Sequence, residues 1–343
     1  MPESKKRITI AEVARRAGVS RTAVSYALRD DPNIAAETRA KIRKVADALG
    51  YRPDPVLAKL MTHLHAGRGR RYAGKLAFLN VHENRDFWKT TAALGDFRLS
   101  AEVRAEELGY GTEEFWLKEP GRTPRRLAQM LEARGIRGLL VGSTGRHGST
   151  VEFPWAKFAA VTVGYSVEAP PLHRVVTHHY RNTWLALRQV IEAGYSRIGF
   201  IADRDAEAAM DNLHLAAFLT YQHETPKTRQ VPPFFWRNGR TEGLRGWWDR
   251  HRPQVVLSTS PGVAELAEAG LRVPDDVALV NLLLWDAGEG VAGVRPGYER
   301  LGAAAVNLLA GQLQHDEFGV PEDSKIVQVE GRWCGGASLP KAG

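Results

Sequence analysis

Four polar side chains near the N-terminus are the residues best suited to specific chemistry. They can exchange hydrogen bonds with base edges and phosphates, and they are Arg21, Thr22, Ser25 and Tyr26. Their spacing places them on the polar face of a helix predicted over residues 21–28. Ser20 precedes that helix and is a residue type that caps helix N-termini. A helix of this kind, set after a tight turn, is typical of the helix that enters the major groove of DNA.

The elements around this polar face predict a small helical domain. Apolar residues recur at helical spacing on both sides of Gly18, at Val13, Ala17, Val19, Val24 and Ala27. Gly18 supplies the positive φ that a tight turn between two helices requires. A third helix is expected over residues 36–49, and its apolar side would close a three-helix core. An ordinary helical hairpin is the alternative, and the third helix and the polar face argue against it.

The positive charge of the chain is gathered at the same end. Residues 1–75 contain 17 Lys and Arg against 7 Asp and Glu, a balance of +10. The rest of the chain has a balance of −2, so the N-terminal part supplies the whole net charge of +8. A surface that docks on phosphates needs such an excess of positive charge. The charge distribution therefore favours DNA contact at this end alone.

A long stretch that includes these residues resembles the headpiece and hinge of the LacI/GalR family of transcriptional regulators. It reads TIAEVARRAGVSRTAVSYALRDDPNIAAETRAKIRKVADALGYRPDPVLAKL, from residue 9 to residue 60. The resemblance implies a set of DNA-contacting residues in the headpiece: Thr9, Ser20, Arg21, Thr22, Ser25, Tyr26, Asn33 and Thr38. The first two would contact phosphates at helix N-termini, the next two would read bases, and the last two would add backbone contacts. Tyr26 stands where the family often has Arg or His, and Ala35 stands where it often has a capping Ser or Thr.

The next segment predicts a short helix. Residues 54–55 are Asp-Pro, which combines an N-cap residue with proline at the first helical position. The helix would span about residues 55–64 within a hinge and linker at 53–73, and a helix this brief frays alone in water. The resemblance implies that it forms on DNA, pairs with its twin from a second subunit and inserts Leu60 into the minor groove. Leu57, in the same DNA-contacting helix, stands where the family usually has a small Ala.

Length and composition set further limits. A chain of 343 residues has room for a headpiece over residues 1–52 and a larger core over 74–343. The single cysteine, Cys334, excludes an internal disulfide and suits a reducing compartment. The N-terminus has no apolar signal region, and no apolar run approaches the roughly 18 residues of a membrane span. We therefore expect a cytoplasmic protein with no membrane partner. Because a single headpiece contacts only a few base pairs, we also expect a homodimer that acts on a pseudo-palindromic operator in double-stranded DNA.

From residue 74 onward, short apolar runs alternate with amphipathic stretches. This alternation predicts parallel sheets covered by helices, and the number of units favours two doubly wound α/β lobes behind the all-α headpiece. One of the helices is expected over residues 208–221. A last strand is expected over residues 326–329.

The resemblance adds the connectivity of this core. It implies a two-lobed, periplasmic-binding-protein-like fold that binds an effector and dimerises, with a chain that crosses between the lobes three times. These crossings are expected near Thr177, Val294 and Ser324. The N-lobe would then cover about residues 74–176 and 295–324, and the C-lobe about 177–294 and 325–340.

Residues at the ends of the predicted strands are the candidates for ligand binding, because open α/β sheets bind ligands at the carboxyl ends of their strands. Strand ends and family positions together give Asn80, His82, His214, Trp236, Thr259, Trp285 and Tyr298. The family usually has an Arg in place of His214 and an Asp in place of Leu283, and Asn212 or Asp286 are the candidate substitutes. Aromatic faces stack on pyranose rings, so this lining favours a carbohydrate effector. The alternatives are core packing for each Trp, a non-sugar effector, or no effector.

Catalytic, metal and cofactor sites find little support in the sequence. Residues 288–293 satisfy the pattern GxGxxG, but they lead into Val-Arg-Pro rather than into a helix that could hold a pyrophosphate. The pairs His63 with His65 and His178 with His179 lack partners at metal-ligand spacing. We therefore expect no catalysis, no cofactor and no metal. A solute-binding protein is a less favoured alternative, because it would not need the basic headpiece.

Overall fold

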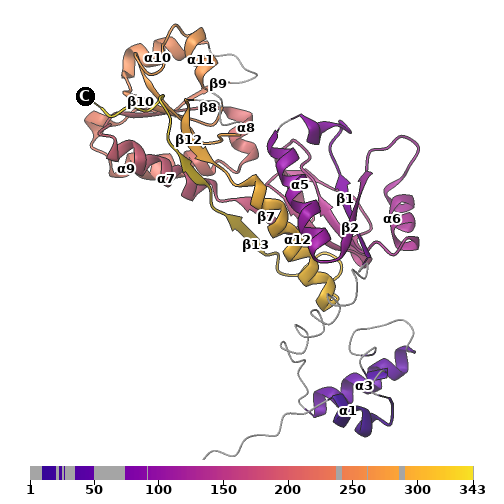
Figure 1. The fold of residues 1–343 in the computed structure, drawn as a ribbon. Helices are drawn as coiled ribbons and strands as arrows, with labels where there is room; N and C mark the ends of the chain where they lie inside the picture. Colours follow the sequence, from indigo (N-terminus) through magenta and orange to yellow (C-terminus); the bar gives the residue numbers. More distant parts are fainter. Residues whose placement is uncertain are drawn as a thin grey trace, which may run out of the picture. The chain divides into compact units, whose positions relative to one another are not determined.

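A computed structural model describes residues 10–20, 23–24, 27, 35–49, 74–90, 92–236, 242–260, 262–285 and 290–342. The chain divides into two compact units, the first built on Met1–Ala73 and the second on Gly74–Ala310 with Phe318–Gly343 (Figure 1). The predicted hinge helix lies outside the described residues. So do most of the predicted DNA-contacting residues, namely Thr9, Arg21, Thr22, Ser25, Tyr26, Asn33, Leu57 and Leu60.

The first unit is held together by small apolar side chains. It contains helices α1 (Ile10–Ala17) and α3 (Ala36–Ala48). One buried cluster comprises Val13, Ala14, Ala17, Val24, Ala27, Ile42 and Ala46. Gly18 has a φ of +71°, and the N–H of Val19 donates to the carbonyl oxygen of Ala14 at 3.0 Å. The small apolar core that the sequence predicts is therefore present among the described residues.

The second unit contains two six-stranded sheets, and the first of them forms the N-lobe. Its order is β13-β7-β5-β3-β1-β2, with every pair parallel. The strands are β1 (Gly74–Asn80), β2 (Tyr110–Trp116), β3 (Gly138–Val141), β5 (Ala159–Val163), β7 (His173–Thr177) and β13 (Ile326–Val329). Side chains alternate across the sheet, so that Leu79 and Leu139 face α6 (Pro124–Ala133), where they join one fully buried cluster.

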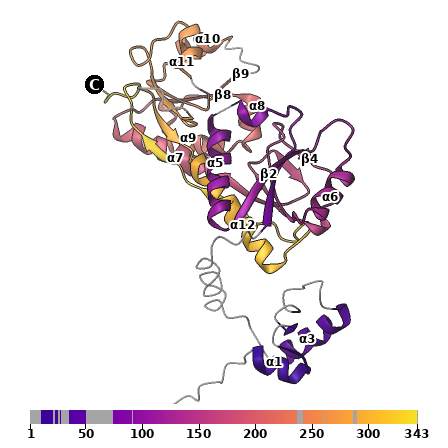
Figure 2. The same ribbon diagram turned by 45° about the vertical axis from the view of Figure 1, so that its right-hand side comes forward.

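The opposite face of this sheet is covered by α5 (Ala92–Glu107). This helix lies beside α12 (Tyr298–His315), as both ribbon views show (Figures 1 and 2). Gly302 of α12 makes the close approach possible, because a Cβ at that position would collide with the carbonyl oxygen of Phe97 on α5. The two helices therefore pack backbone against backbone.

The second sheet forms the C-lobe, with the order β14-β12-β11-β10-β8-β9. Its pairs are parallel except β12 with β14. The strands are β8 (Ile198–Asp203), β9 (Phe234–Trp236), β10 (Val255–Ser258), β11 (Ala278–Asn281), β12 (Ala292–Arg295) and β14 (Arg332–Cys334). Helices α7 (His179–Glu192) and α9 (Leu213–Glu224) cover one face, and α10 (Leu244–His251) and α11 (Val263–Glu268) cover the other (Figure 1). The predicted fold class, two parallel α/β lobes behind a helical headpiece, is confirmed.

The third crossing between the lobes was expected near Ser324, but it lies further along the chain. Strand β13 still belongs to the N-lobe sheet, where Val327 pairs with Val175 of β7. The chain reaches the C-lobe only between β13 and β14, so residues 325–329 belong to the N-lobe and not to the C-lobe. Ile326 and Val327 are exposed at the sheet edge, so their apolar pattern does not reveal which sheet they extend.

The helix expected over residues 208–221 is also different. The structure has two helices there, α8 (Arg204–Ala209) and α9, separated by a turn. Asp211 and Asn212 in that turn have φ values of +59° and +55°, a left-handed conformation that Asp and Asn adopt more readily than most residues. The break matters for the site, because it places Glu207 of α8 beside His214 of α9.

Candidate functional site

Ser20 and Thr38 are the two predicted DNA-contacting residues that the structure describes. The Oγ of Ser20 accepts a hydrogen bond from the N–H of Ala23 at 3.1 Å, so this side chain caps the second helix. Thr38 lies in the first turn of α3 and is partly exposed. Ala35 precedes α3 and makes no side-chain capping bond, as expected for a residue without a polar side chain. Contact of Ser20 and Thr38 with DNA stays a prediction.

Asn80 and His82 organise the loop that follows β1. The Oδ1 of Asn80 accepts the N–H of His82 at 3.1 Å, and its Nδ2 donates to the carbonyl oxygen of Arg85 at 2.7 Å. The His82 ring stacks on Phe87, with centroids 3.8 Å apart. The Nδ1 of His82 accepts the N–H of Asn84 at 2.9 Å. Both predicted effector residues therefore make local bonds that fix the loop.

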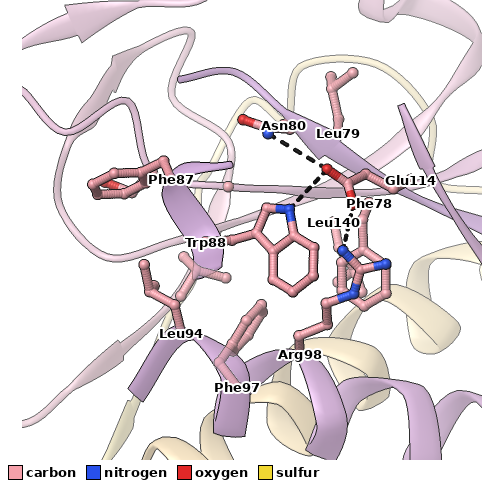
Figure 3. A pocket seen from close by; sticks show the side chains of 13 residues that line it. Phe78, Leu79, Asn80, Phe87, Trp88, Leu94, Phe97, Arg98, Glu114 and Leu140 are labelled. Carbon is pink, nitrogen blue, oxygen red and sulfur yellow. Dashed lines mark hydrogen bonds and ion pairs between the residues drawn. The ribbon is translucent and has the colours of Figure 1, made fainter. Parts of the chain in front are cut away.

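A pocket of about 90 Å³ opens beside this loop, between the N-lobe sheet and α5 (Figure 3). Its apolar walls are Phe78, Phe87, Trp88, Leu94, Phe97, Leu140 and Val163. Phe78 pairs in register with Leu140 on one side and with Glu114 on the other, so the three side chains share the face under α5. Gly142, just beyond β3, leaves space there, since a Cβ at that position would meet only the carbonyl oxygen of Leu79, at 3.6 Å.

The polar side chains of this pocket bind one another. Glu114 accepts a hydrogen bond from the Nε1 of Trp88 at 3.0 Å and forms an ion pair with Arg98, as Figure 3 shows. Arg98 also pairs with Glu102 at 2.8 Å, and its guanidinium lies 4.1 Å from the centroid of the Trp88 ring. Burial opposes the charge of Arg98, but its hydrogen bonds to Glu114 and Glu102 raise its pKa above the ordinary value.

The C-lobe places His214 in a buried hydrogen-bonded row. Its Nε2 lies 3.1 Å from the Nδ1 of His179, and its Nδ1 lies 3.0 Å from the Oε2 of Glu207. The Oε1 of Glu207 accepts the N–H of Leu215 at 2.9 Å. All three side chains of the row are buried, and burial, followed by the neighbouring His214 and His178, holds the pKa of His179 well below its usual range. Because both ring nitrogens of His214 have partners, its role as an effector contact stays a prediction.

The other candidates lie at different depths. Trp236 is 4% exposed and packs in a core cluster with Leu244 and Trp248. Thr259 follows β10, is 6% exposed, and its Oγ1 has no hydrogen-bond partner within the described part of the chain. An unpaired buried hydroxyl is costly unless a ligand or water binds it. Thr259 is therefore better placed than Trp236 to contact a ligand.

Trp285 and Tyr298 bring together predicted effector residues from opposite lobes. Trp285 lies between β11 and β12 of the C-lobe, and Tyr298 begins α12 of the N-lobe. Their ring centroids are 5.0 Å apart at an angle of 42°. Burial raises the pKa of Tyr298 to about 12, so its hydroxyl stays protonated at neutral pH and can donate a hydrogen bond.

The charged residues that the family usually presents are replaced here. Leu283 is 3% exposed, so the position where an Asp is usual is apolar and buried. Asp286, one of the two candidate substitutes, lies outside the described residues. Asn212, the other, is partly exposed, and its Oδ1 has no hydrogen-bond partner among the described residues. Of the two candidate substitutes for the missing charged residues, Asn212 is the one that the structure describes, and its Oδ1 could accept a hydrogen bond from a ligand.

Several residues of these sites were not predicted from the sequence. Trp88 and Glu114 are 26 positions apart, and only the pairing of β1 with β2 brings their side chains together. Glu207 and His214 are separated by the helix break at residues 211–212, which a helical pattern conceals. Glu114 within the apolar end of β2 is the one usable signal, since a polar residue on a covered face needs a partner.

No group of three His, Cys, Asp or Glu side chains in the described ranges is arranged to hold a metal ion. Within the same ranges, no helix combines the length and apolar character that a membrane span requires.

A capped helix-turn-helix unit joined to two parallel α/β lobes defines a DNA-binding regulator with a ligand-binding core. Comparison with known families supports this class. Residues 9–54 match the model of bacterial regulatory proteins of the lacI family, and residues 187–334 match a periplasmic binding protein-like domain. The chain therefore combines a DNA-binding domain of the lacI family with a periplasmic-binding-protein-like domain, as its resemblance to LacI-family regulators predicts.

Full-length relatives agree with this assignment. The HTH-type transcriptional regulator PtxS of Pseudomonas plecoglossicida is 25% identical, over 93% of both chains. The HTH-type transcriptional repressor PurR of Haemophilus influenzae is 23% identical over 93% of this chain and 95% of its own. The lactose operon repressor of Escherichia coli is 22% identical over 80% of this chain and 75% of its own.

Solved structures share the fold. A complex of the transcriptional regulator CelR with cellobiose has a TM-score of 0.56 at 21% identity, covering 97% of this chain and all of that one. The Lac repressor dimer bound to operator and the anti-inducer ONPF has a TM-score of 0.55 at 17% identity, covering 98% of this chain and all of that one. At these identities the likeness concerns the fold alone.

Proposed function

We propose that this regulator is a homodimeric repressor that binds a pseudo-palindromic operator and is controlled by a small molecule held between its lobes. The observation that carries the proposal is the headpiece. A glycine turn, a small apolar core and a capped second helix coincide with the residues that match the lacI family model. The residues predicted to read bases, Arg21 and Thr22, directly follow the capping Ser20 in the sequence.

Two-fold pairing suits the surface of α5. Leu99 and Val103 lie one turn apart on this helix and are 61% and 50% exposed. The surface beside them continues onto α12 through Ala303. Exposed apolar side chains at helical spacing are suited to burial against a second copy of the same helix. A dimer doubles the base contacts of one headpiece, which explains the need for a symmetric site.

The effector is a carbohydrate in this proposal. Trp285 and Tyr298 offer aromatic faces from both lobes, and Thr259 and Asn212 offer polar atoms that have no hydrogen-bond partner within the described ranges. The regulator CelR, which has a similar fold, forms a complex with cellobiose. Because the action is on genomic DNA, we place the protein in the cytoplasm of a bacterium. It acts through binding rather than catalysis, like its regulator relatives.

Selection from randomised duplexes tests the function directly. Full-length protein is incubated with a pool of random DNA at fixed salt, because affinity for DNA depends steeply on salt. We expect enrichment of a short palindrome that binds at least about a thousandfold more tightly than bulk DNA. A sugar screen by thermal shift, with hits carried into operator binding, then tests the effector. Absence of any palindromic preference with and without sugars contradicts the proposal.

A further inference from the structure

We propose that the pocket beneath α5 binds an apolar group of the effector, a short alkyl chain or a single aromatic ring. The inference rests on the proposed function only in assigning that group to an effector. The pocket itself, and the chemistry it accepts, follow from the side chains around it (Figure 3).

The polar groups at the pocket are already bonded to one another, so a hydroxyl-rich ligand would have to compete with these bonds. The carboxylate of Glu114 already accepts from Trp88 and is paired with Arg98, which in turn holds Glu102. The Oγ of Ser143 donates to the Oγ of Ser166 at 3.0 Å. A sugar hydroxyl entering here would lose its hydrogen bonds to water without gaining equivalent ones. An apolar group, by contrast, gains by leaving water.

The pocket lies on the face of the N-lobe sheet that α5 covers. On the opposite face, Ala77 and Leu139 are fully covered within a continuous core. Under α5, the sheet presents the ion-paired Glu114 and the bare Gly142 where the neighbouring positions carry bulky side chains. Protein interiors are normally close-packed, so an open volume of about 90 Å³ lined by rings and aliphatic carbons is an unfilled binding volume.

Position and size favour a ligand over a simple packing gap. The lining includes the residues at or just past the ends of β1, β3 and β5, namely Asn80, Gly142 and Val163. That edge of a parallel sheet is where ligands of α/β proteins bind. The volume is smaller than the roughly 150 Å³ of an apolar cavity that accommodates benzene. Because this pocket is open on one side, a ring or alkyl group can enter while the rest of the ligand stays outside.

Gly142 gives a direct test with a minimal probe. Fluorobenzene is titrated into the full-length protein and followed by its 19F signal, which reports saturable binding. Gly142→Ala adds one methyl group that meets only a carbonyl oxygen at an ordinary contact distance, so the fold is retained. Gly142→Val fills more of the same space. We expect affinity to fall by about threefold for Ala and by about tenfold or more for Val.

A glycine elsewhere on the covering helix provides the matched control. Gly95 of α5 has no heavy atom within 4 Å of a built Cβ and is not part of the pocket lining, so Gly95→Ala should bind fluorobenzene like the original protein. Lack of saturable binding of fluorobenzene overturns the inference. Equal affinity of the original protein, Gly95→Ala and Gly142→Ala for fluorobenzene overturns it as well. If Gly142→Val does not fold, the Ala variant alone decides.

The link to the effector is tested by competition. Sugars and alkyl or aryl glycosides that shift operator affinity are added to the fluorobenzene complex. We expect active compounds to displace fluorobenzene, and simultaneous binding of both would overturn the assignment of the pocket to the effector. The operator selection described above is independent of this assay. Palindrome enrichment without fluorobenzene binding defeats the inference alone, whereas fluorobenzene binding without enrichment defeats the proposed function alone.

Discussion

The Nδ1 of His179 lies 3.1 Å from the Nε2 of His214, at the meeting point of α7 and α9. Glu207 accepts a hydrogen bond from the other nitrogen of His214, at 3.0 Å. A carboxylate can only accept when ionised, so His214 carries its proton on Nδ1 and presents a lone pair on Nε2. His179 then donates through its Nδ1–H. One buried carboxylate thereby fixes the tautomers of two buried imidazoles.

This relationship predicts how stability depends on pH. The pKa of His179 in the folded protein is well below the value near 6.5 of an unfolded chain. Below about pH 6.5, the unfolded state therefore takes up a proton that the folded state excludes. The stabilising contribution is complete above that pH and is lost as the pH falls below it. His179→Leu should flatten the fall in the free energy of unfolding between about pH 7 and pH 5, measured by urea denaturation. The exposed His147→Leu is the control, and an unchanged slope in His179→Leu contradicts the prediction.

Ser20 is predicted to act both as a helix cap and as a phosphate contact. Its Oγ accepts the N–H of Ala23, so Ser20→Ala should cost the headpiece about 1 kcal/mol, measured by hydrogen exchange in the full-length protein. Ser20→Asp keeps a capping oxygen but places a negative charge at the DNA surface. It should preserve the protection of headpiece amides and yet weaken operator binding. Operator binding by Ser20→Asp at the original strength would remove Ser20 from the phosphate contacts.

Leu99 tests the proposed dimer surface. Replacing this 61% exposed side chain by Asp puts a charge where two copies of α5 are expected to meet. We expect sedimentation velocity to show a shift from dimer to monomer, and operator affinity to fall because one headpiece contacts only a half-site. Ile191→Asp, at a 48% exposed position of α7, serves as the matched control and should stay dimeric. A Leu99→Asp protein that remains dimeric would place the interface elsewhere.

Arg21 is predicted to carry base recognition. Arg21→Ala should weaken binding to the selected operator by about 1–3 kcal/mol if the side chain reads a guanine. The loss should be confined to one base pair of each half-site, so binding to variants at that position should become equal. Fluorescence anisotropy with a set of single-base operator variants measures this. Uniform weakening across all variants would instead indicate a phosphate contact.

The sequence predicts the headpiece better than the ligand sites, and the reason is physical. The turn at Gly18, the cap at Ser20 and the apolar positions around them depend on residues within one or two helical turns. Local patterns report such contacts directly. The strands of both lobes are predictable for the same reason, because β1 and β3 are continuous apolar runs in buried parallel sheets.

Contacts between distant segments have no such local signal. The bond between Trp88 and Glu114 requires β1 and β2 to pair in one register, and the row from Glu207 to His179 requires a helix break and a second helix. The placement of β13 in the N-lobe likewise depends on a parallel edge pairing with β7. Strand pairing is set by the whole fold, so residues that meet only through it escape a reading of the sequence alone.

Replacing Trp236 and Trp285 in turn distinguishes a tryptophan that packs in the core from one that contacts the ligand. Trp236 is 4% exposed inside the C-lobe core, so Trp236→Ala should lower the free energy of unfolding by about 3–5 kcal/mol. Trp285 is only partly buried and lies against Tyr298 of the other lobe, so Trp285→Ala should cost less stability but weaken effector binding by about tenfold or more. Denaturation and calorimetric titration with a sugar identified by the screen measure the two effects. If Trp236→Ala loses effector affinity without losing stability, Trp236 lines the ligand site after all, because a residue that only packs cannot change binding while the fold keeps its full free energy.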